Sequence, residues 1–273
     1  MKKYLPFLNM CIHIVFMLIL AVINIEGTQR LLYGDRNTKE ETQENPIEFA
    51  SVMELLPESH ELKMNRKVKK AAYLTFDDGP SDNTDRILDI LKKKGVKATF
   101  FVVGKTGQKA EERYRRIVEE GHTLGLHSYS HRYEEIYDSL DHFKEDVLKL
   151  RDYLYEVTGE RTWVYRFPGG SSNSVAKISI HECIDFLKEE GIVHYDWNAS
   201  SEDAVSTGVS CSVLNSNVLK DALRFQQPVI LMHDLHECNN TAEGLEALID
   251  QLKEEGYEIC PIEKDTRPVQ HVK

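Results

Sequence analysis

Short apolar runs alternate with amphipathic segments from Lys69 onward. The apolar runs have the length of buried strands and cover residues 71–76, 98–103, 122–127, 163–167, 192–197, 229–232 and 257–262. Between them, helical patterns cover residues 82–94, 106–120, 143–154, 174–190, 212–223 and 241–255. Gly95, Gly121 and Gly159 follow three of these segments, at positions that are typical of helix ends.

This alternation predicts an α/β fold. Because each connection between strands is long enough for a helix, we expect parallel strands covered by helices. The pattern is compatible with a barrel and with a doubly wound sheet. In both architectures the functional site lies at the carboxyl ends of the strands, where the loops that follow them meet.

The first 25 residues have a different pattern. Residues 1–3 carry two lysines, and a mostly apolar run over residues 4–25 has about the length of a transmembrane helix. No small-x-small cleavage site ends this run, and the lysines favour a cytoplasmic N-terminus. We therefore predict a cytoplasmic stub (1–3), then a single-pass transmembrane anchor or uncleaved signal (4–25), with the following domain extracellular. Cleavage would give a secreted form.

The rest of the chain divides by composition. Residues 26–68 are polar and charged without sustained periodicity, which predicts a linker. The folded domain is expected at residues 69–265, followed by a tail at residues 266–273. A formal net charge of −11 and the lack of a long basic run argue against nucleic acid as a partner. The sequence leaves the oligomeric state open.

The cysteines beyond the apolar run would lie outside the cytoplasm, where disulfides form. Four cysteines allow three pairings, and free thiols are an equal alternative. No two of them form a C-x-x-C pair, so a thiolate zinc site is not expected. The residues concerned are Cys183, Cys211, Cys238 and Cys260.

Ionisable residues gather directly after the predicted strands. Two imidazoles and one carboxylate leave open positions on a divalent ion, which is the composition of a catalytic metal site. Histidines four apart can lie on one side of a helical turn. Adjacent aspartates can enter one site only if the backbone turns between them, and a Gly-Pro pair supplies such a turn. These residues are Asp77-Asp78-Gly79-Pro80, His127, His131, Arg166 and His233-Asp234.

Together these motifs resemble the NodB-type polysaccharide deacetylases, carbohydrate esterase family 4. The matching segments, in the family's order across about residues 69–265, are Leu74–Pro80, the H-S-x-x-H of His127–His131, the R-x-P-x-G of Arg166–Gly170, Asp203 and Leu231–Asp234. The resemblance implies an irregular (β/α) barrel of parallel strands with outer helices. It also implies a metal-dependent hydrolase that removes N-acetyl groups from an envelope polysaccharide.

The resemblance implies three metal ligands, which are Asp78, His127 and His131. Zinc is the expected ion by family analogy, and cobalt, nickel and manganese also suit imidazole and carboxylate ligands. The ion would polarise the acetyl carbonyl and acidify a bound water.

The catalytic roles also follow from the resemblance. Asp77 would take the proton of the water, and Arg166 would pair with Asp77. His233 would protonate the leaving amine, and Asp203 would hold the imidazolium. Since Asp196 lies seven residues before Asp203, either aspartate could orient His233, although the order of motifs favours Asp203.

The sequence departs from the family at two places. Gly169-Gly170 follows Pro168 where the family often has Tyr, and Ala204 follows Asp203 where it often has Trp. The first change opens the expected substrate wall. A backbone N–H near Gly169 could still bind an oxyanion.

Three other functions have some support in the sequence. A haloacid-dehalogenase-type phosphohydrolase spaces its two aspartates by one residue and has no use for His127 and His131. A membrane-tethered carbohydrate-binding protein without catalysis and an O-acetyl polysaccharide esterase stay open. For a deacetylase, N-acetylglucosamine or N-acetylmuramic acid of peptidoglycan is the leading substrate.

Overall fold

The computed structural model describes residues 70–205 and 208–273. The stub, anchor and linker expected over residues 1–68 lie outside the described residues. No helix in the described ranges is long and apolar enough to cross a membrane. The strands are β1 (Ala71–Asp77), β2 (Thr99–Val103), β3 (Thr123–Ser128), β4 (Val164–Tyr165), β5 (Val193–His194), β6 (Ala199–Ser200), β7 (Val229–His233) and β8 (Glu258–Ile259).

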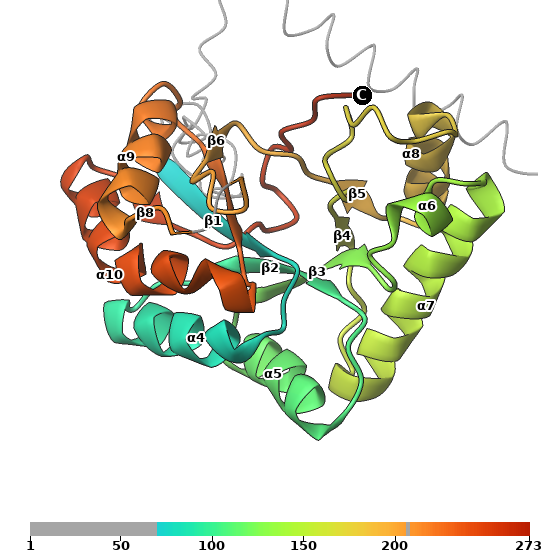
Figure 1. Cartoon of the computed structure of the whole chain (residues 1–273), viewed down its shortest axis with the longest axis horizontal. Helices are drawn as coiled ribbons and strands as arrows, with labels where there is room; N and C mark the ends of the chain where they lie inside the picture. The colour runs from blue at the N-terminus through green and yellow to red at the C-terminus, as the bar shows by residue number, and fades with distance from the viewer. Residues whose placement is uncertain (1–69, 206–207) are drawn as a thin grey trace, which may run out of the picture. The chain divides into compact units, whose positions relative to one another are not determined.

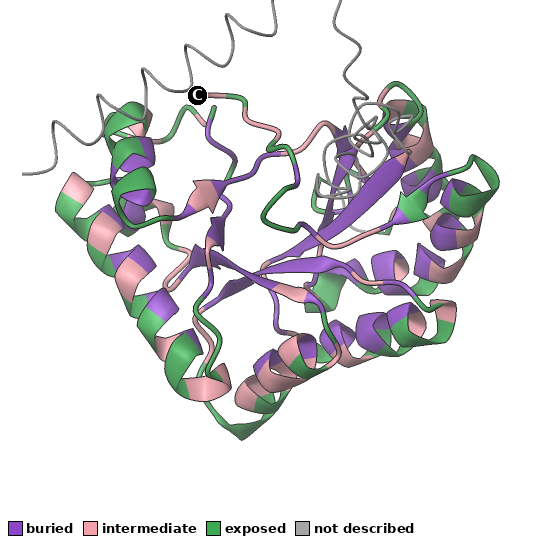
Figure 2. Cartoon of the chain, turned by 180° about the vertical axis from the view of Figure 1, so that it is seen from behind, coloured by how far each residue is buried: buried purple, intermediate pink, exposed green. Residues whose placement is uncertain are grey.

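Helices connect the strands and surround them (Figure 1). Figure 2 shows that the strands are mostly buried, whereas most helices are buried on one side and exposed on the other. They are α4 (Asp82–Lys94), α5 (Gln108–Glu119), α6 (Tyr133–Ile136), α7 (Leu140–Thr158), α8 (Ile180–Glu189), α9 (Cys211–Ala222) and α10 (Asn239–Glu254), with a 3-10 turn η1 (His236–Cys238).

The strands form one parallel sheet in the order β5-β4-β3-β2-β1-β7-β6, and β8 pairs with the start of β1. The two outermost strands, β5 and β6, are separated in the chain only by residues 195–198. Five peptide steps span at most about 18 Å. In a flat sheet, strands at the two ends of this order would lie about 29 Å apart. The sheet must therefore curve, and the described domain is an incomplete barrel, as predicted, rather than a doubly wound sheet.

Alternate residues of each strand pack on opposite faces of the sheet. In β1, Leu74 and Phe76 join the large core between strands and helices. Tyr73 joins a smaller cluster with Phe101 and Val164, which fills the barrel interior. The same alternation decides which side chains enter the barrel at its carboxyl end.

The observed elements match the predicted segments most closely where periodicity is strong, as in α4, which ends at the predicted Gly95 with φ of 65°. The helix expected from Ser174 begins later, at Ile180. Asn173 Oδ1 accepts hydrogen bonds from the backbone of Val175 and Ala176, which holds a turn there instead. The short elements β6, α6 and η1 were not predicted.

The last eight residues, expected as a tail, pack against the barrel. Asp196 N donates to the carbonyl of Val269, and Val272 N donates to Ser171 Oγ. His194 Nε2 also bonds to the Val272 carbonyl. This segment therefore belongs to the folded domain as the structure describes it. Cys183, Cys211 and Cys238 are free thiols, so none of the three disulfide pairings is present among the described residues.

Candidate active site

Four of the predicted site residues occupy inward-facing positions at the carboxyl ends of strands. Asp77 lies on the same face of β1 as Tyr73, and His233 ends β7 opposite Asp77 in the strand register. His127 lies near the end of β3, and Arg166 follows β4 directly. Asp77, His127 and Arg166 are buried, so the barrel collects these ionisable groups at one end.

Asp78 reaches the same site because the backbone turns at Asp78 itself. Its φ is 71°, and its N–H donates to the Phe101 carbonyl at 3.1 Å. Lys105 Nζ donates to the carbonyls of Asp78 and Pro80 and so supports the turn. Gly79 must lack a side chain, because a Cβ would lie 2.3 Å from Asp234 Oδ2. Two adjacent carboxylates thus face one site.

Asp78, His127 and His131 form the group of ligand atoms that could hold a metal ion, all within 4.8 Å of one another. Asp78 Oδ1 lies 3.3 Å from His127 Nε2 and 3.0 Å from His131 Nε2. This oxygen is buried and makes no hydrogen bond of acceptable geometry. A buried carboxylate oxygen without a hydrogen bond and two nearby imidazole nitrogens form a donor set that suits a divalent cation.

His127 is held in the tautomer that a metal ligand needs. Its Nδ1 lies 2.8 Å from the Arg166 carbonyl oxygen. Because that carbonyl can only accept, Nδ1 carries the proton, and Nε2 of the neutral ring keeps a free lone pair toward Asp78. The donor set therefore fits a divalent metal ion.

His131 joins the site through a loop and not through the helical turn that the four-residue spacing suggested. It follows β3, and its backbone has φ of 52°. Ser128 Oγ accepts the His131 N–H at 2.8 Å, which fixes this left-handed conformation. The H-S-x-x-H motif thus forms a tight turn at a strand end.

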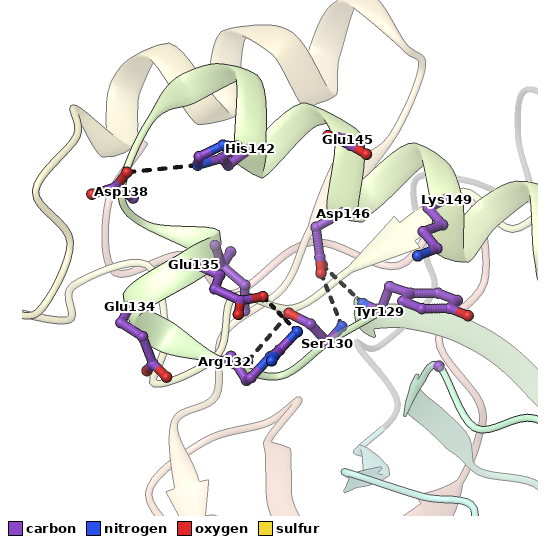
Figure 3. Close-up of a pocket in the computed structure, with 12 residues that line it drawn as sticks. Tyr129, Ser130, Arg132, Glu134, Glu135, Asp138, His142, Glu145, Asp146 and Lys149 are labelled. Carbon is purple, nitrogen blue, oxygen red and sulfur yellow. Dashed lines mark hydrogen bonds and ion pairs between the residues drawn. The ribbon is translucent and has the colours of Figure 1, made fainter.

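Asp146 on α7 organises the same turn. Its carboxylate accepts hydrogen bonds from Ser128 Oγ, Tyr129 N and Ser130 N, at 2.8, 2.8 and 2.9 Å. Figure 3 shows Asp146 reaching from α7 to Tyr129 and Ser130. A buried helix carboxylate therefore determines the backbone path between His127 and His131.

A pocket of about 610 Å³ lies between this turn, α6 and α7 (Figure 3). Arg132, Glu135, His142 and Lys149 are among the residues that line it. None of the predicted catalytic or metal-binding residues does so. The pocket is therefore separate from the candidate metal ligands Asp78, His127 and His131.

Arg166 is fully buried and donates hydrogen bonds to groups inside the barrel. Nη1 donates to Asp77 Oδ1 at 2.8 Å and to Thr75 Oγ1 at 2.6 Å. Nε and Nη2 donate to the carbonyls of Tyr195 and Asp196. The other oxygen of Asp77, Oδ2, lies 4.0 Å from His127 Nε2. Arg166 therefore binds one Asp77 oxygen, and the other Asp77 oxygen faces the candidate metal ligand His127.

His233 contacts Asp203 and not Asp196. Asp203 Oδ1 lies 2.7 Å from His233 Nδ1, and Oδ2 accepts the His233 N–H at 2.9 Å. Thr241 Oγ1 also donates to Asp203 Oδ2. Asp196 instead accepts hydrogen bonds from Ser171 and from the backbone of His271. The alternative that the sequence left open is resolved by these contacts.

The surroundings of the site shift the pKa values of two of its ionisable groups in opposite directions. Burial alone would raise the pKa of Asp78, but the His127 and His131 imidazoles hold it far below its ordinary value. Burial opposes a charge on His233, yet the hydrogen bond and charge of Asp203 raise its pKa to about 9. An ionised carboxylate and a protonated histidine therefore coexist in this site at neutral pH.

Sequence reasoning missed Asp146, Lys105 and the structural role of Asp234. Asp234 is buried, accepts from Ser81 Oγ at 2.6 Å and Thr84 Oγ1 at 2.5 Å, and donates its N–H to the Asp77 carbonyl. It thereby joins β7 to the start of α4. Asp146 did leave a signal, since a carboxylate stands three residues after Phe143 on the apolar face of α7.

Comparison with known proteins finds relatives of this chain. The family model described as polysaccharide deacetylase matches residues 64–183. YheN of Bacillus subtilis, which carries only a provisional description as a polysaccharide deacetylase, is 30% identical over 98% of this chain and 93% of its own length. A peptidoglycan-N-acetylglucosamine deacetylase of Bacillus cereus is 31% identical over 79% of this chain and 78% of its own length.

A solved structure shares the fold. The catalytic domain of a peptidoglycan N-acetylglucosamine deacetylase from Eubacterium rectale matches with a TM-score of 0.70 and 33% identity. The match covers 74% of this chain and 93% of that domain. Relatives that align over most of both chains therefore share one family and one fold with this protein.

Proposed function

Because this chain belongs to the polysaccharide deacetylase family of hydrolases, we propose that it removes N-acetyl groups from an envelope polysaccharide in a metal-dependent reaction. The names of its relatives favour the N-acetylglucosamine units of peptidoglycan, and N-acetylmuramic acid is the second choice. The observation that carries the proposal is the position of Asp77. One oxygen is held by Arg166, and the other lies 4.0 Å from a nitrogen of the metal cluster.

The proposed chemistry begins with hydrolytic attack on the acetyl carbonyl. A divalent ion held by Asp78, His127 and His131, with zinc as our choice, would polarise that carbonyl and lower the pKa of a water. Asp77 then accepts the proton of the attacking water. Arg166 supports this role, because its hydrogen bond fixes the orientation of the Asp77 carboxylate.

The second half of the reaction needs an acid. An amine is a poor leaving group unless its nitrogen gains a proton as the carbon–nitrogen bond breaks. His233 has the proton to give, since its pKa lies at about 9. The contact between Asp203 and Nδ1 leaves Nε2 as the donor in this proposal. A water nucleophile makes a covalent acyl-enzyme unnecessary.

We also propose that the domain works outside the cytoplasm, where peptidoglycan lies. The apolar run at residues 4–25 and the lysines before it support an anchored form with this orientation. Protease treatment of intact cells tests it. Degradation of the domain without lysis is expected, and protection until lysis would contradict the proposed location.

Mass spectrometry of muropeptides before and after incubation with the purified full chain tests the reaction. We expect the loss of one acetyl group from a sugar unit, dependent on added zinc. Asp77→Asn should abolish the loss. Release of acetate only from O-acetylated sugars would favour an esterase. Glycan binding without any acetate release would favour a non-catalytic carbohydrate-binding protein.

A further inference from the structure

Tyr133 lies between the candidate metal ligand His131 and Gly169, a loop residue without a side chain. It is the first residue of α6, and its ring meets the His131 ring edge to face, with centroids 5.6 Å apart. A Cβ on Gly169 would lie 3.2 Å from both Cε1 and the hydroxyl oxygen of Tyr133. The phenol end of Tyr133 therefore lies over Gly169.

Gly169 makes this arrangement possible. Its φ is 76°, a conformation that side-chain-bearing residues rarely adopt, and a Cβ there would make an unusually tight contact with the tyrosine. The space beside Gly169 is thus filled by an aromatic ring from a different element, α6. Tyr133 therefore places an aromatic ring next to the candidate metal ligand His131, although the segment Arg166–Gly170 has no aromatic residue after Pro168.

A second tyrosine holds the ring in place. Tyr137 contacts Tyr133 with ring centroids 5.9 Å apart, and Tyr137 is buried. The Tyr137 hydroxyl donates to the Pro168 carbonyl at 2.8 Å, which links α6 to the loop that contains Gly169. Tyr133 is therefore supported from behind by a fixed side chain.

Tyr133 itself is half-buried, and its hydroxyl can still form a hydrogen bond. Within the part of the chain that the structure describes, no hydrogen bond engages its hydroxyl. A rigid ring with a free hydroxyl, next to reactive carboxylates, has the properties of a ligand-contacting residue.

We propose that Tyr133 contacts the sugar unit whose acetyl group is removed, packing its ring against the apolar face of that sugar and so determining substrate affinity. The proposal rests on the proposed function for the identity of the ligand. Binding and catalysis can nevertheless be measured apart, which allows the two to fail separately.

The test begins with binding to the full chain carrying Asp77→Asn, so that no turnover occurs. Calorimetry with an N-acetylglucosamine tetramer compares Tyr133, Tyr133→Leu and Tyr133→Phe in that background. We expect Tyr133→Leu to weaken binding about three- to tenfold, in line with the size of aromatic contacts. Tyr133→Phe should stay within about threefold, since the ring is kept. Tyr155→Leu, which removes an exposed tyrosine on α7, is the matched control.

Steady-state kinetics with Asp77 intact provides the second measurement. Tyr133→Leu should raise KM by the same factor and change kcat by less than about twofold. Zinc affinity should not change. Unaltered binding and KM would overturn the proposal, and so would a fall in kcat that parallels a loss of zinc affinity. A chain that binds the tetramer through Tyr133 but releases no acetate would support this inference and refute the proposed function alone.

Discussion

Asp203 binds His233 at two points, accepting one hydrogen bond from the backbone N–H at 2.9 Å and one from ring Nδ1 at 2.7 Å. The two residues come from different segments at the carboxyl end of the barrel. Because one Asp203 oxygen engages the ring and the other engages the backbone of the same residue, the contact orients the imidazole. This contact outweighs the effect of burial and raises the pKa of His233 to about 9.

The first prediction concerns the pH dependence of the rate. A general acid works only while protonated, so kcat/KM should be steady below the His233 pKa and fall as pH rises through about 9. In Asp203→Asn the pKa should drop toward the ordinary value of 6.5. The protonated fraction at pH 8 would then fall by roughly 10- to 30-fold. The pH profile of kcat/KM measures this. An alkaline limb that stays in place would contradict the role of His233.

The second prediction concerns metal binding. Removing His131 leaves two ligands for the ion, so His131→Ala should weaken zinc binding by at least about 100-fold. Competition with a chromogenic chelator gives the affinity. His142→Ala is the control, because it removes a half-exposed histidine on α7. Chelation of the wild-type chain should abolish acetate release, and added zinc or cobalt should restore it. Equal affinities of the two variants would rule out His131 as a ligand.

A third prediction separates positioning from stability at Asp146. Asn in its place keeps one acceptor oxygen, so Asp146→Asn cannot hold all three donors of the turn. Zinc affinity should fall about 10- to 100-fold, as for groups that orient metal ligands. Asp152→Asn, at an exposed position on the same helix, should leave it unchanged. If Tm falls but zinc affinity does not, Asp146 stabilises the fold without positioning His131.

The architecture could be predicted from the sequence because apolar strand segments alternate with amphipathic helical segments along the chain, and this alternation is what a parallel sheet covered by helices requires. Apolar strands with period two put Asp77 and His233 on the inner face, and parallel strands put both at one end of the barrel. The family resemblance then supplied Asp203, whose contact with His233 depends on the path of residues 201–205. No local pattern specifies that path, which explains why Asp196 was an open alternative.

The turn that joins His127 to His131 depends on contacts that the sequence pattern does not reveal. The spacing of His127 and His131 fits a helical turn and a tight loop equally well, and the loop is chosen by Ser128 and by Asp146 from a distant helix. Short elements such as β6 have two residues, too few to show any period. Tertiary contacts, not local propensity, decided these features.

The last prediction concerns the buried pair of Arg166 and Asp77. Both side chains are almost inaccessible to solvent, and their closest atoms are 2.8 Å apart. Arg166→Met would leave a buried carboxylate without its partner, which costs about 3–5 kcal/mol of unfolding free energy. Denaturant unfolding with a chelator present excludes metal linkage. Adding Asp77→Asn should recover part of the loss, because the unpaired charge disappears. Arg224→Met, at an exposed position, should change stability by less than about 0.5 kcal/mol. A double variant no more stable than Arg166→Met would show that packing, not charge pairing, makes Arg166 necessary for the fold.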